Sequence, residues 1–455
     1  MAALDLLIRG GTVVTAGGQA RADLGIHQGR VAQIGGDMQA AREIDASGLL
    51  LLPGGVDAHV HLAAEPSGWV DDFTSGSAAA LAGGITTIGN MTQVGPEEGL
   101  VAALEREAAE ASRQAIADLF LRPILAEPTS SRVDEIPHLL DRGTSSLKVF
   151  LSSPLFDAHS AGYIRALRCA SEHGLISMLH CEDHAIIQDA TARLVAAGLT
   201  ALRHYPASRP VVAEVVATQR AVALAEATGA PVYLVHVSSR RALAVCADAQ
   251  ARGVPVFVET RPMYLHLTSE RLAEHDAGRY VGQPPLREQE DLEALWAGVR
   301  QGSVSTVCTD HAPWPRAAKL DPGHTIRSLR PGVENLQVML PMLYSEGVRT
   351  GRLSLHRFIE VTSTTAARLF GLYPRKGTLA VGSDADVVIF DPERTRTIEP
   401  SMLKSNADDS VYTGWQVTGW PKMTLRRGEV VFQEDVIMAA PASGEIVRCG
   451  PTQVG

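Results

Sequence analysis

The stretch "PGGVDAHVHL", residues 53–62, follows the apolar run "LLLL" at residues 49–52. Such a nearly continuous apolar segment is typical of a strand in a buried parallel sheet. Alternate side chains of a strand point to the same face, so His59 and His61 leave this strand on one side, where it ends. Two imidazoles that converge at a strand end predict a metal site.

Seven further segments between residues 84 and 310 have the same apolar, strand-like composition. They cover residues 84–91, 118–125, 145–151, 175–182, 231–239, 255–260 and 304–310. Helix-like stretches such as residues 99–114 and 211–229 separate most of them. Eight strands alternating with helices predict a closed (β/α)8 TIM-like barrel. An open doubly wound sheet is the alternative, although no G-x-G-x-x-G turn follows an early strand.

The two ends of the chain differ from this middle. Short β-prone runs separated by glycine-rich turns fill the first fifty residues and recur from about residue 375 onward. We therefore predict a small β-sandwich domain built from both termini. The expected limits are 1–52 for its first part, 53–374 for the barrel, and 375–455 for its second part with a C-terminal tail.

Composition excludes several classes of protein. The chain has 455 residues, and 41 basic against 51 acidic residues give a net charge of -10, which argues against nucleic acid or an anionic membrane as a partner. The five cysteines form no C-x-x-C pair, as expected in a reducing compartment. No apolar run approaches the roughly 20 residues of a membrane span, and "MAALDLLIRGG" lacks the features of a signal peptide. We expect a cytoplasmic protein.

Polar side chains occur where the predicted barrel strands end, which is where barrel enzymes carry their catalytic groups. They are His59, His61, Lys148, His180, His236 and Asp310. Each alone has a structural interpretation: a hydrogen-bonded histidine, a lysine that reaches the surface, or an aspartate that caps a turn. Their joint occurrence favours one site, and imidazoles with a carboxylate but no thiolate favour zinc or a similar divalent ion.

Lys148 is unusual in such a set, because an ammonium repels cations. It fits if it is neutral or if carbon dioxide has converted it to a carbamate, an anion that can bridge two metals. Two metals would lower the pKa of a bridging water and supply hydroxide at neutral pH. Two metals with a bridging hydroxide suit the hydrolysis of an unactivated amide.

Longer motifs add a family resemblance that covers nearly the whole chain. Among them are "LLPGGVDAHVHL", "SSLKVF", "YLVHVSS", "YVGQPPLR", "TDHAPW" and "PGVENLQVMLP". In these the sequence resembles the cyclic amidohydrolases, most closely the dihydropyrimidinase and hydantoinase branch. The resemblance implies one metal on His59, His61 and Asp310, and a second on His180 and His236.

The same resemblance implies two divalent ions, most simply Zn²⁺, bridged by hydroxide and by N6-carboxylysine at Lys148. Asp310 would take a proton from the hydroxide and pass it to the leaving ring nitrogen. The substrate would be a dihydropyrimidine or a 5-substituted hydantoin. The family also implies a homo-oligomer, a tetramer or a dimer.

Departures from the family pattern concern the substrate. Ser153 stands where hydantoinases carry an oxyanion-stabilising tyrosine, and Gln283 replaces a serine before "PPLR". The family has Asn-Gly shortly before "PGVE", and Ser328 is the first of the two residues that stand there in this chain. Arg330, directly before "PGVE", is a candidate to bind a substrate carboxylate. Ala63 stands where dihydroorotases carry an arginine, which argues against dihydroorotate as the substrate.

Three functions therefore remain open at this point. A hydrolase of dihydropyrimidines or hydantoins fits best, the loop after Lys148 is similar to that of allantoinases, and a non-catalytic dihydropyrimidinase-like scaffold is disfavoured by the intact ligand set. Residues beside the candidate ligands are expected to orient them or to shape the pocket. They are Asp57, Glu182, Thr309 and His311.

Overall fold

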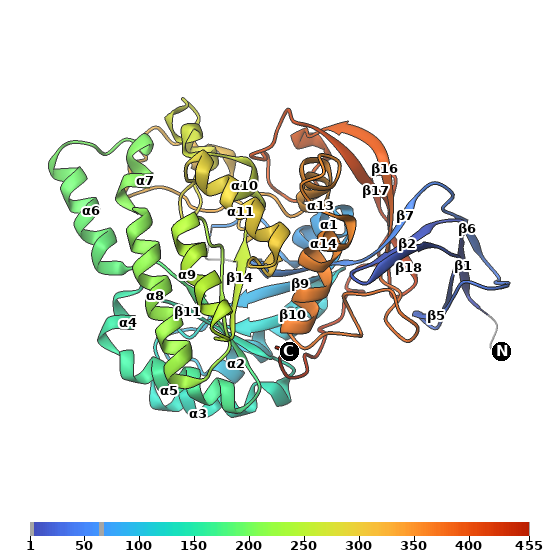
Figure 1. Cartoon of the computed structure of the whole chain (residues 1–455), viewed down its shortest axis with the longest axis horizontal. Helices are drawn as coiled ribbons and strands as arrows, with labels where there is room; N and C mark the ends of the chain where they lie inside the picture. Colours follow the sequence, from blue (N-terminus) through green and yellow to red (C-terminus); the bar gives the residue numbers. More distant parts are fainter. Residues whose placement is uncertain (1–3, 63–67, 455) are drawn as a thin grey trace.

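The structure of the chain is a computed structural model that describes residues 4–62 and 68–454. Ala63, where the sequence lacks the dihydroorotase arginine, lies outside the described residues. A large barrel with helices on its outside occupies one side of the molecule, and two sheets built from the chain ends occupy the other (Figure 1).

In the described part of the chain, eight parallel strands form the barrel, in the order of the sequence. They are β8 (Gly55–Val60), β9 (Ile85–Thr92), β10 (Asp118–Pro123), β11 (Ser146–Phe150), β12 (Ile176–His180), β13 (Val232–Leu234), β14 (Val256–Thr260) and β15 (Thr306–Val307). The parallel bridge between Ile124 and Lys148 joins β10 to β11, and the bridge between Val60 and His311 closes the ring. The predicted barrel is confirmed, and the open doubly wound sheet is excluded.

Helices connect the strands and cover the barrel from outside, as the right-handed crossover rule requires. The longer ones are α1 (Phe73–Ala82), α2 (Leu100–Gln114), α5 (Ser160–Glu172), α6 (His184–Ala196), α8 (Val211–Thr228), α9 (Arg240–Ala251) and α11 (Gln289–Gln301). Shorter helices lie in the loops and after β15: α3 (Ser130–Glu135), α4 (Pro154–Ala158), α7 (Tyr205–Ser208), α10 (Pro262–His266), α12 (Arg316–Lys319), α13 (Met339–Leu343), α14 (Leu355–Ile359) and α15 (Thr365–Leu369).

The second domain is a β-sandwich, as predicted, and both chain termini contribute to it. One sheet has the order β5-β4-β1-β6, from β5 (Arg30–Ile34), β4 (Leu24–His27), β1 (Leu6–Arg9) and β6 (Glu43–Asp45). The other has the order β19-β18-β17-β16-β7-β2-β3, from β19 (Val436–Ile437), β18 (Glu429–Gln433), β17 (Gln416–Arg426), β16 (Val387–Thr397), β7 (Leu50–Pro53), β2 (Thr12–Thr15) and β3 (Gly18–Arg21). Apolar side chains from both sheets, such as Leu24 and Leu425, form its core.

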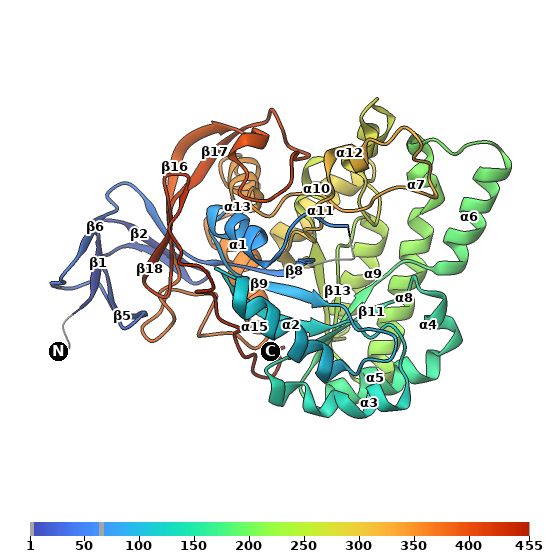
Figure 2. The same ribbon diagram turned by 180° about the vertical axis from the view of Figure 1, so that it is seen from behind.

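One residue separates the sandwich from the barrel at the start of the chain, because β7 ends at Pro53 and β8 begins at Gly55. After β19 the tail leaves the sandwich and returns to the barrel, where Val447 N donates to Leu119 O (2.6 Å). Figure 2 shows the end of the tail beside α15, where Gln453 N donates a hydrogen bond to Arg368 O (3.1 Å). The domain limits at residues 52 and 374 stay a prediction. Within the two described ranges, no helix is long and apolar enough to cross a membrane.

Candidate metal centre

The barrel strands bring the six predicted residues to one end of the barrel. His59 lies in β8 and His61 just after it, Lys148 lies in β11, and His180 ends β12. His236 and Asp310 follow β13 and β15, and both have left-handed backbone, with φ of 42° and 49°. Such backbone is unfavourable for residues other than glycine, and it gathers at functional sites because it aims a side chain where a regular strand would not.

His59, His61 and Asp310 form the first cluster. Asp310 Oδ1 lies 3.2 Å from His59 Nε2 and 3.0 Å from His61 Nε2. One nitrogen or oxygen atom from each of the three residues lies within 4.8 Å of the others, a spacing that allows a single ion to bind all three. Two imidazoles and a carboxylate are a common ligand set for a divalent metal.

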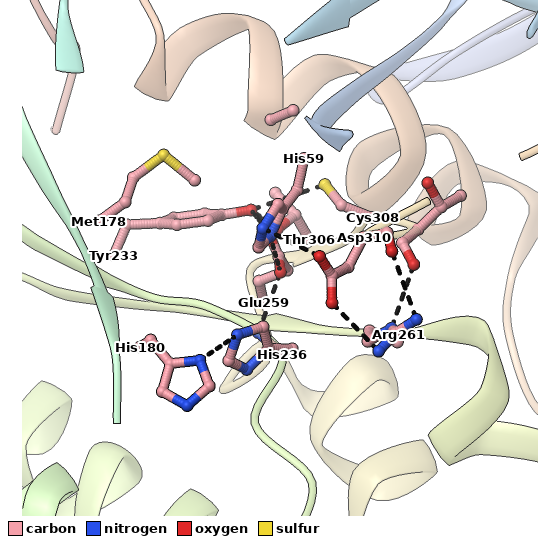
Figure 3. Close-up of polar contacts among 12 residues, drawn as sticks. His59, Met178, His180, Tyr233, His236, Glu259, Arg261, Thr306, Cys308 and Asp310 are labelled. Atoms are coloured by element: carbon pink, nitrogen blue, oxygen red, sulfur yellow. Dashed lines mark hydrogen bonds and ion pairs between the residues drawn. The ribbon is translucent and has the colours of Figure 1, made fainter. Parts of the chain in front are cut away.

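Glu259 fixes the chemistry of this cluster (Figure 3). Its Oε1 accepts from His59 Nδ1 (2.8 Å), so His59 carries its proton on Nδ1 and a lone pair on Nε2. Burial lowers the pKa of His59 to about 4, so the ring is neutral. Two electron-pair donors, His59 Nε2 and the Asp310 carboxylate, therefore face each other, an arrangement that a cation between them would stabilise. The residues fit a metal.

His180 and His236 form the second cluster, with His180 Nδ1 3.0 Å from His236 Nε2. His180 Nε2 donates to Glu182 Oε2 (2.8 Å), which leaves the lone pair on Nδ1. Arg209 in turn binds Glu182 through Nη2 (2.6 Å). Burial lowers the pKa of both imidazoles, so both rings are neutral and able to bind a metal. In the described part of the chain, His236 Nδ1 is buried and has no hydrogen-bond partner.

Lys148 belongs to neither cluster, but it lines the same pocket. Its side chain is 1% exposed, and its Nζ lies 5.0 Å from the centre of the Phe150 ring. Burial lowers the pKa of Lys148 to about 8, with Glu259 and Asp310 opposing the shift. A fraction of the amine is therefore neutral near pH 7, which is the form that reacts with carbon dioxide.

Arg261 holds the other oxygen of Asp310. Its Nη1 lies 3.1 Å from Asp310 Oδ2, and its Nε donates to Thr309 O (3.1 Å). Burial alone would raise the pKa of Asp310, but the positive charge of Arg261 opposes burial most strongly, and that pKa lies well below its usual value. Asp310 is thus an ionised carboxylate, able to bind a cation and to accept a proton.

The six residues open onto one pocket of about 210 Å³. The rest of its lining is formed by Trp69, Gln93, Phe150, Ser152, Gln283, Ala312, Pro331 and Gly332. Of the four predicted substrate-binding residues, the pocket lining among the described residues contains Gln283 and lacks Ser153, Ser328 and Arg330.

Those three residues have other contacts. Ser153 Oγ accepts from Leu155 N (3.2 Å) and caps α4. Ser328 Oγ accepts from Thr325 N (3.0 Å). The Arg330 guanidinium lies 5.3 Å from the centre of the Trp314 ring.

The expected neighbours of the ligands connect the strand ends. Asp57 Oδ1 accepts from His59 N (3.1 Å), and its Oδ2 accepts from Thr309 Oγ1 (2.5 Å). His311 Nε2 lies 2.7 Å from Asp71 Oδ2, which also accepts from Ser405 Oγ (2.5 Å). Through Asp71, His311 is thus connected to the segment after β16, and this contact holds the chain beside Asp310 in place.

Comparison with known proteins identifies the family. The Amidohydrolase family model matches residues 50–431 of this chain. The chain belongs to the amidohydrolase family. This amidohydrolase is 37% identical over 449 residues to the D-hydantoinase of Rhizobium radiobacter, covering 97% of this chain and 98% of that protein. It is 38% identical over 459 residues to the D-phenylhydantoinase of Escherichia coli O1:K1 / APEC, covering 98% and 99%.

Solved structures support the same family and the same fold. A dihydropyrimidinase from Brevibacillus agri superposes with a TM-score of 0.94 at 34% identity, covering 98% of this chain and 99% of that one. The resemblance read from the sequence motifs is therefore confirmed for this amidohydrolase, as is its fold of a TIM barrel with a β-sandwich.

Two residues of the centre were not singled out in the sequence, Glu259 and Arg261. A signal for Glu259 was present, because a carboxylate in the apolar strand "PVFVET" must find buried partners. Arg261 follows that strand and offers no such signal, since its partner Asp310 is 49 residues away and only the barrel brings them together.

Proposed function

We propose that this amidohydrolase opens the amide bond of a cyclic amide, a dihydropyrimidine or a 5-substituted hydantoin, with two divalent metal ions, most simply Zn²⁺. His59, His61 and Asp310 would hold one ion, His180 and His236 the other, and carboxylated Lys148 both. The observation that carries the proposal is the convergence of four imidazoles, an ionised aspartate and a buried lysine on one pocket. The two ions would supply a water of lowered pKa and polarise the carbonyl under attack.

Asp310 moves the proton in this scheme. Its carboxylate is ionised and faces the pocket, so it can accept a proton from the attacking water and donate it to the departing ring nitrogen. Arg261 holds Oδ2 of that carboxylate, and Oδ1 lies within 3.2 Å of the His59 and His61 imidazoles. A base that is held in place loses little orientational freedom as the reaction proceeds.

Groups around the pocket would hold the ring. Gln283 supplies an amide on one side, and Trp69 and Phe150 supply aromatic surface for a ring substituent. Ser153, Ser328 and Arg330 would contribute through their backbone or through movement of their loops. Because Ser153 caps α4, the oxyanion depends on the metals rather than on a hydroxyl at that position.

A cyclic ureide such as allantoin is the second candidate substrate. Ser153, in place of the hydantoinase tyrosine, favours it, and the same pocket would admit it. We also propose that the enzyme works in the cytoplasm as a homo-oligomer, a tetramer or a dimer, which light scattering on the purified protein tests.

Ring opening tests the proposed function. Protein expressed with zinc and bicarbonate is mixed with dihydrouracil, 5-substituted hydantoins and allantoin, and loss of the cyclic substrate is followed by absorbance. We expect robust turnover of at least one of the first two. Turnover of allantoin alone would select the second candidate, and no turnover by protein that carries two metals per chain would refute both.

A further inference from the structure

A short segment, Arg330-Pro331-Gly332, forms one side of the active-site pocket, and we name it the pocket strap. Pro331 and Gly332 line the pocket directly. All three of its carbonyl oxygens accept hydrogen bonds from side chains of residues 314–319. Trp314 Nε1 donates to Pro331 O (2.8 Å), and Lys319 Nζ donates to Arg330 O (3.2 Å) and to Gly332 O. The strap is therefore held by two side chains that take no part in metal binding.

Lys319 also reaches a second part of the pocket wall. Its third hydrogen bond goes to Val281 O (3.0 Å), two residues before Gln283. Gly332 N donates to the same Val281 oxygen (3.1 Å). An ammonium has three N–H donors, and here each of them meets a different backbone carbonyl. Lys319 thus fixes the distance between the strap and the segment that carries Gln283.

The surroundings of Lys319 are unusual for a lysine. The side chain is 6% exposed at the end of α12 (labelled in Figure 2), and within the described part of the chain it forms no ion pair. Burial lowers the pKa of Lys319 to about 7, while the three carbonyl oxygens around Nζ favour the charged form, which alone has three donors. A buried ammonium without a carboxylate partner is costly, so three well-placed carbonyls are its main compensation.

The strap is also confined on its other face. Gly332 has φ of 122°, and a Cβ at this position would lie 2.2 Å from Ala312 O. Ala312 lines the pocket two residues after Asp310. The strap thus packs between Ala312, which follows Asp310, and the ammonium of Lys319. Small movements of either would change the width of the pocket.

We propose that Lys319 is a positioning residue that sets substrate affinity by clamping the pocket strap against the Gln283 segment. The inference rests on the proposed function. With its carbonyls engaged by Lys319 and Trp314, the strap presents the Pro331 ring to the substrate and contributes shape, while Gln283 supplies hydrogen bonds. Loss of the clamp should therefore weaken binding of the ring and leave the metals in place.

The test compares Lys319→Gln and Lys319→Met with Lys422→Gln, a control at an exposed lysine of β17. Kinetics on the best substrate, zinc content, and hydrogen exchange of peptides covering residues 328–336 are measured for each. For both Lys319 variants we expect KM to rise about tenfold or more, kcat to change less than about threefold, and zinc to stay at the wild-type level. Exchange in the strap peptide should quicken about tenfold or more, and the control should match wild type.

Wild-type KM and wild-type exchange in folded Lys319→Gln would overturn the proposal, as would a loss of zinc that accounts for the loss of activity. If Lys319→Met does not fold, Lys319→Gln, which keeps an amide donor, decides. If the wild-type enzyme opens no cyclic amide, the proposed function fails on that result. Hydrogen exchange then still shows whether Lys319 clamps the strap.

Discussion

Glu259→Gln should weaken metal binding without unfolding the barrel. Glu259 is fully buried, and its Oε1 accepts from His59 Nδ1 (2.8 Å) and from the backbone N of His236 (2.9 Å). Its Oε2 accepts from Tyr233 Oη (2.9 Å). One carboxylate therefore orients a candidate ligand of each metal. Glutamine has the same shape and keeps an oxygen acceptor, but it lacks the charge.

The magnitude follows from the two bonds on Oε1. A hydrogen bond to a charged group contributes about 1.5–3 kcal/mol and one to a neutral group about 0.5–1.5 kcal/mol, so each bond weakens by about 1 kcal/mol. The sum of about 2 kcal/mol corresponds to about a 30-fold loss of affinity. Substitutions of residues that orient metal ligands fall in this range, about 10- to 100-fold.

Zinc competition with a chromophoric chelator measures the affinity. Glu107→Gln is the matched control, because Glu107 is also buried but accepts from Asn90 and Thr92 rather than from a ring of the metal centre. Both variants should unfold cooperatively when heated. A Glu259→Gln protein that binds zinc within twofold of wild type would show that Glu259 does not orient the ligands.

Four further substitutions give separate tests. Lys376→Met removes the ammonium that three buried aspartates share. It should therefore lower the free energy of unfolding by about 3–5 kcal/mol, measured by urea denaturation. A loss below about 1 kcal/mol would contradict this. Burial raises the pKa of Glu107 to about 7, so the folded state holds an extra proton between about pH 4.5 and pH 7 and wild-type stability falls as pH rises through that interval. Glu107→Gln should remove this slope and be about 1–3 kcal/mol more stable at pH 8, and equal slopes in denaturation from pH 4.5 to 8 would refute the assignment. Lys148→Ala should lose at least one zinc and most turnover, and full metal content with full turnover would exclude a carbamate bridge. Asp310→Asn should keep some zinc but lose about 100-fold or more in kcat, and an unchanged kcat would remove Asp310 from proton transfer.

Much of the architecture could be predicted because local patterns carry it. Eight apolar runs alternating with helical stretches predict a barrel, and polar residues at the strand ends predict where its site lies. His59 and His61 share a strand, so the period of two alone places them together. The barrel then gathers His180, His236 and Asp310 without any local signal for their distances.

What could not be predicted depends on contacts between distant segments. The pairing of Arg261 with Asp310 and the clamp of Lys319 on the strap exist only once the barrel has closed. The substrate-binding residues are predicted from their positions in family motifs. A position in a motif does not tell in which direction the side chain points. Ser153 illustrates this, since its hydroxyl caps a helix while Ser152, its neighbour, lines the pocket.

The central claim is that two metal ions on these six side chains open a cyclic amide. Its most direct test is a titration of metal-free enzyme with zinc, in the presence of bicarbonate, that follows ring opening of the best cyclic substrate. We predict turnover that rises with added zinc and saturates at two equivalents per chain. Full turnover without zinc, saturation at one equivalent, or no turnover at two equivalents would contradict the account.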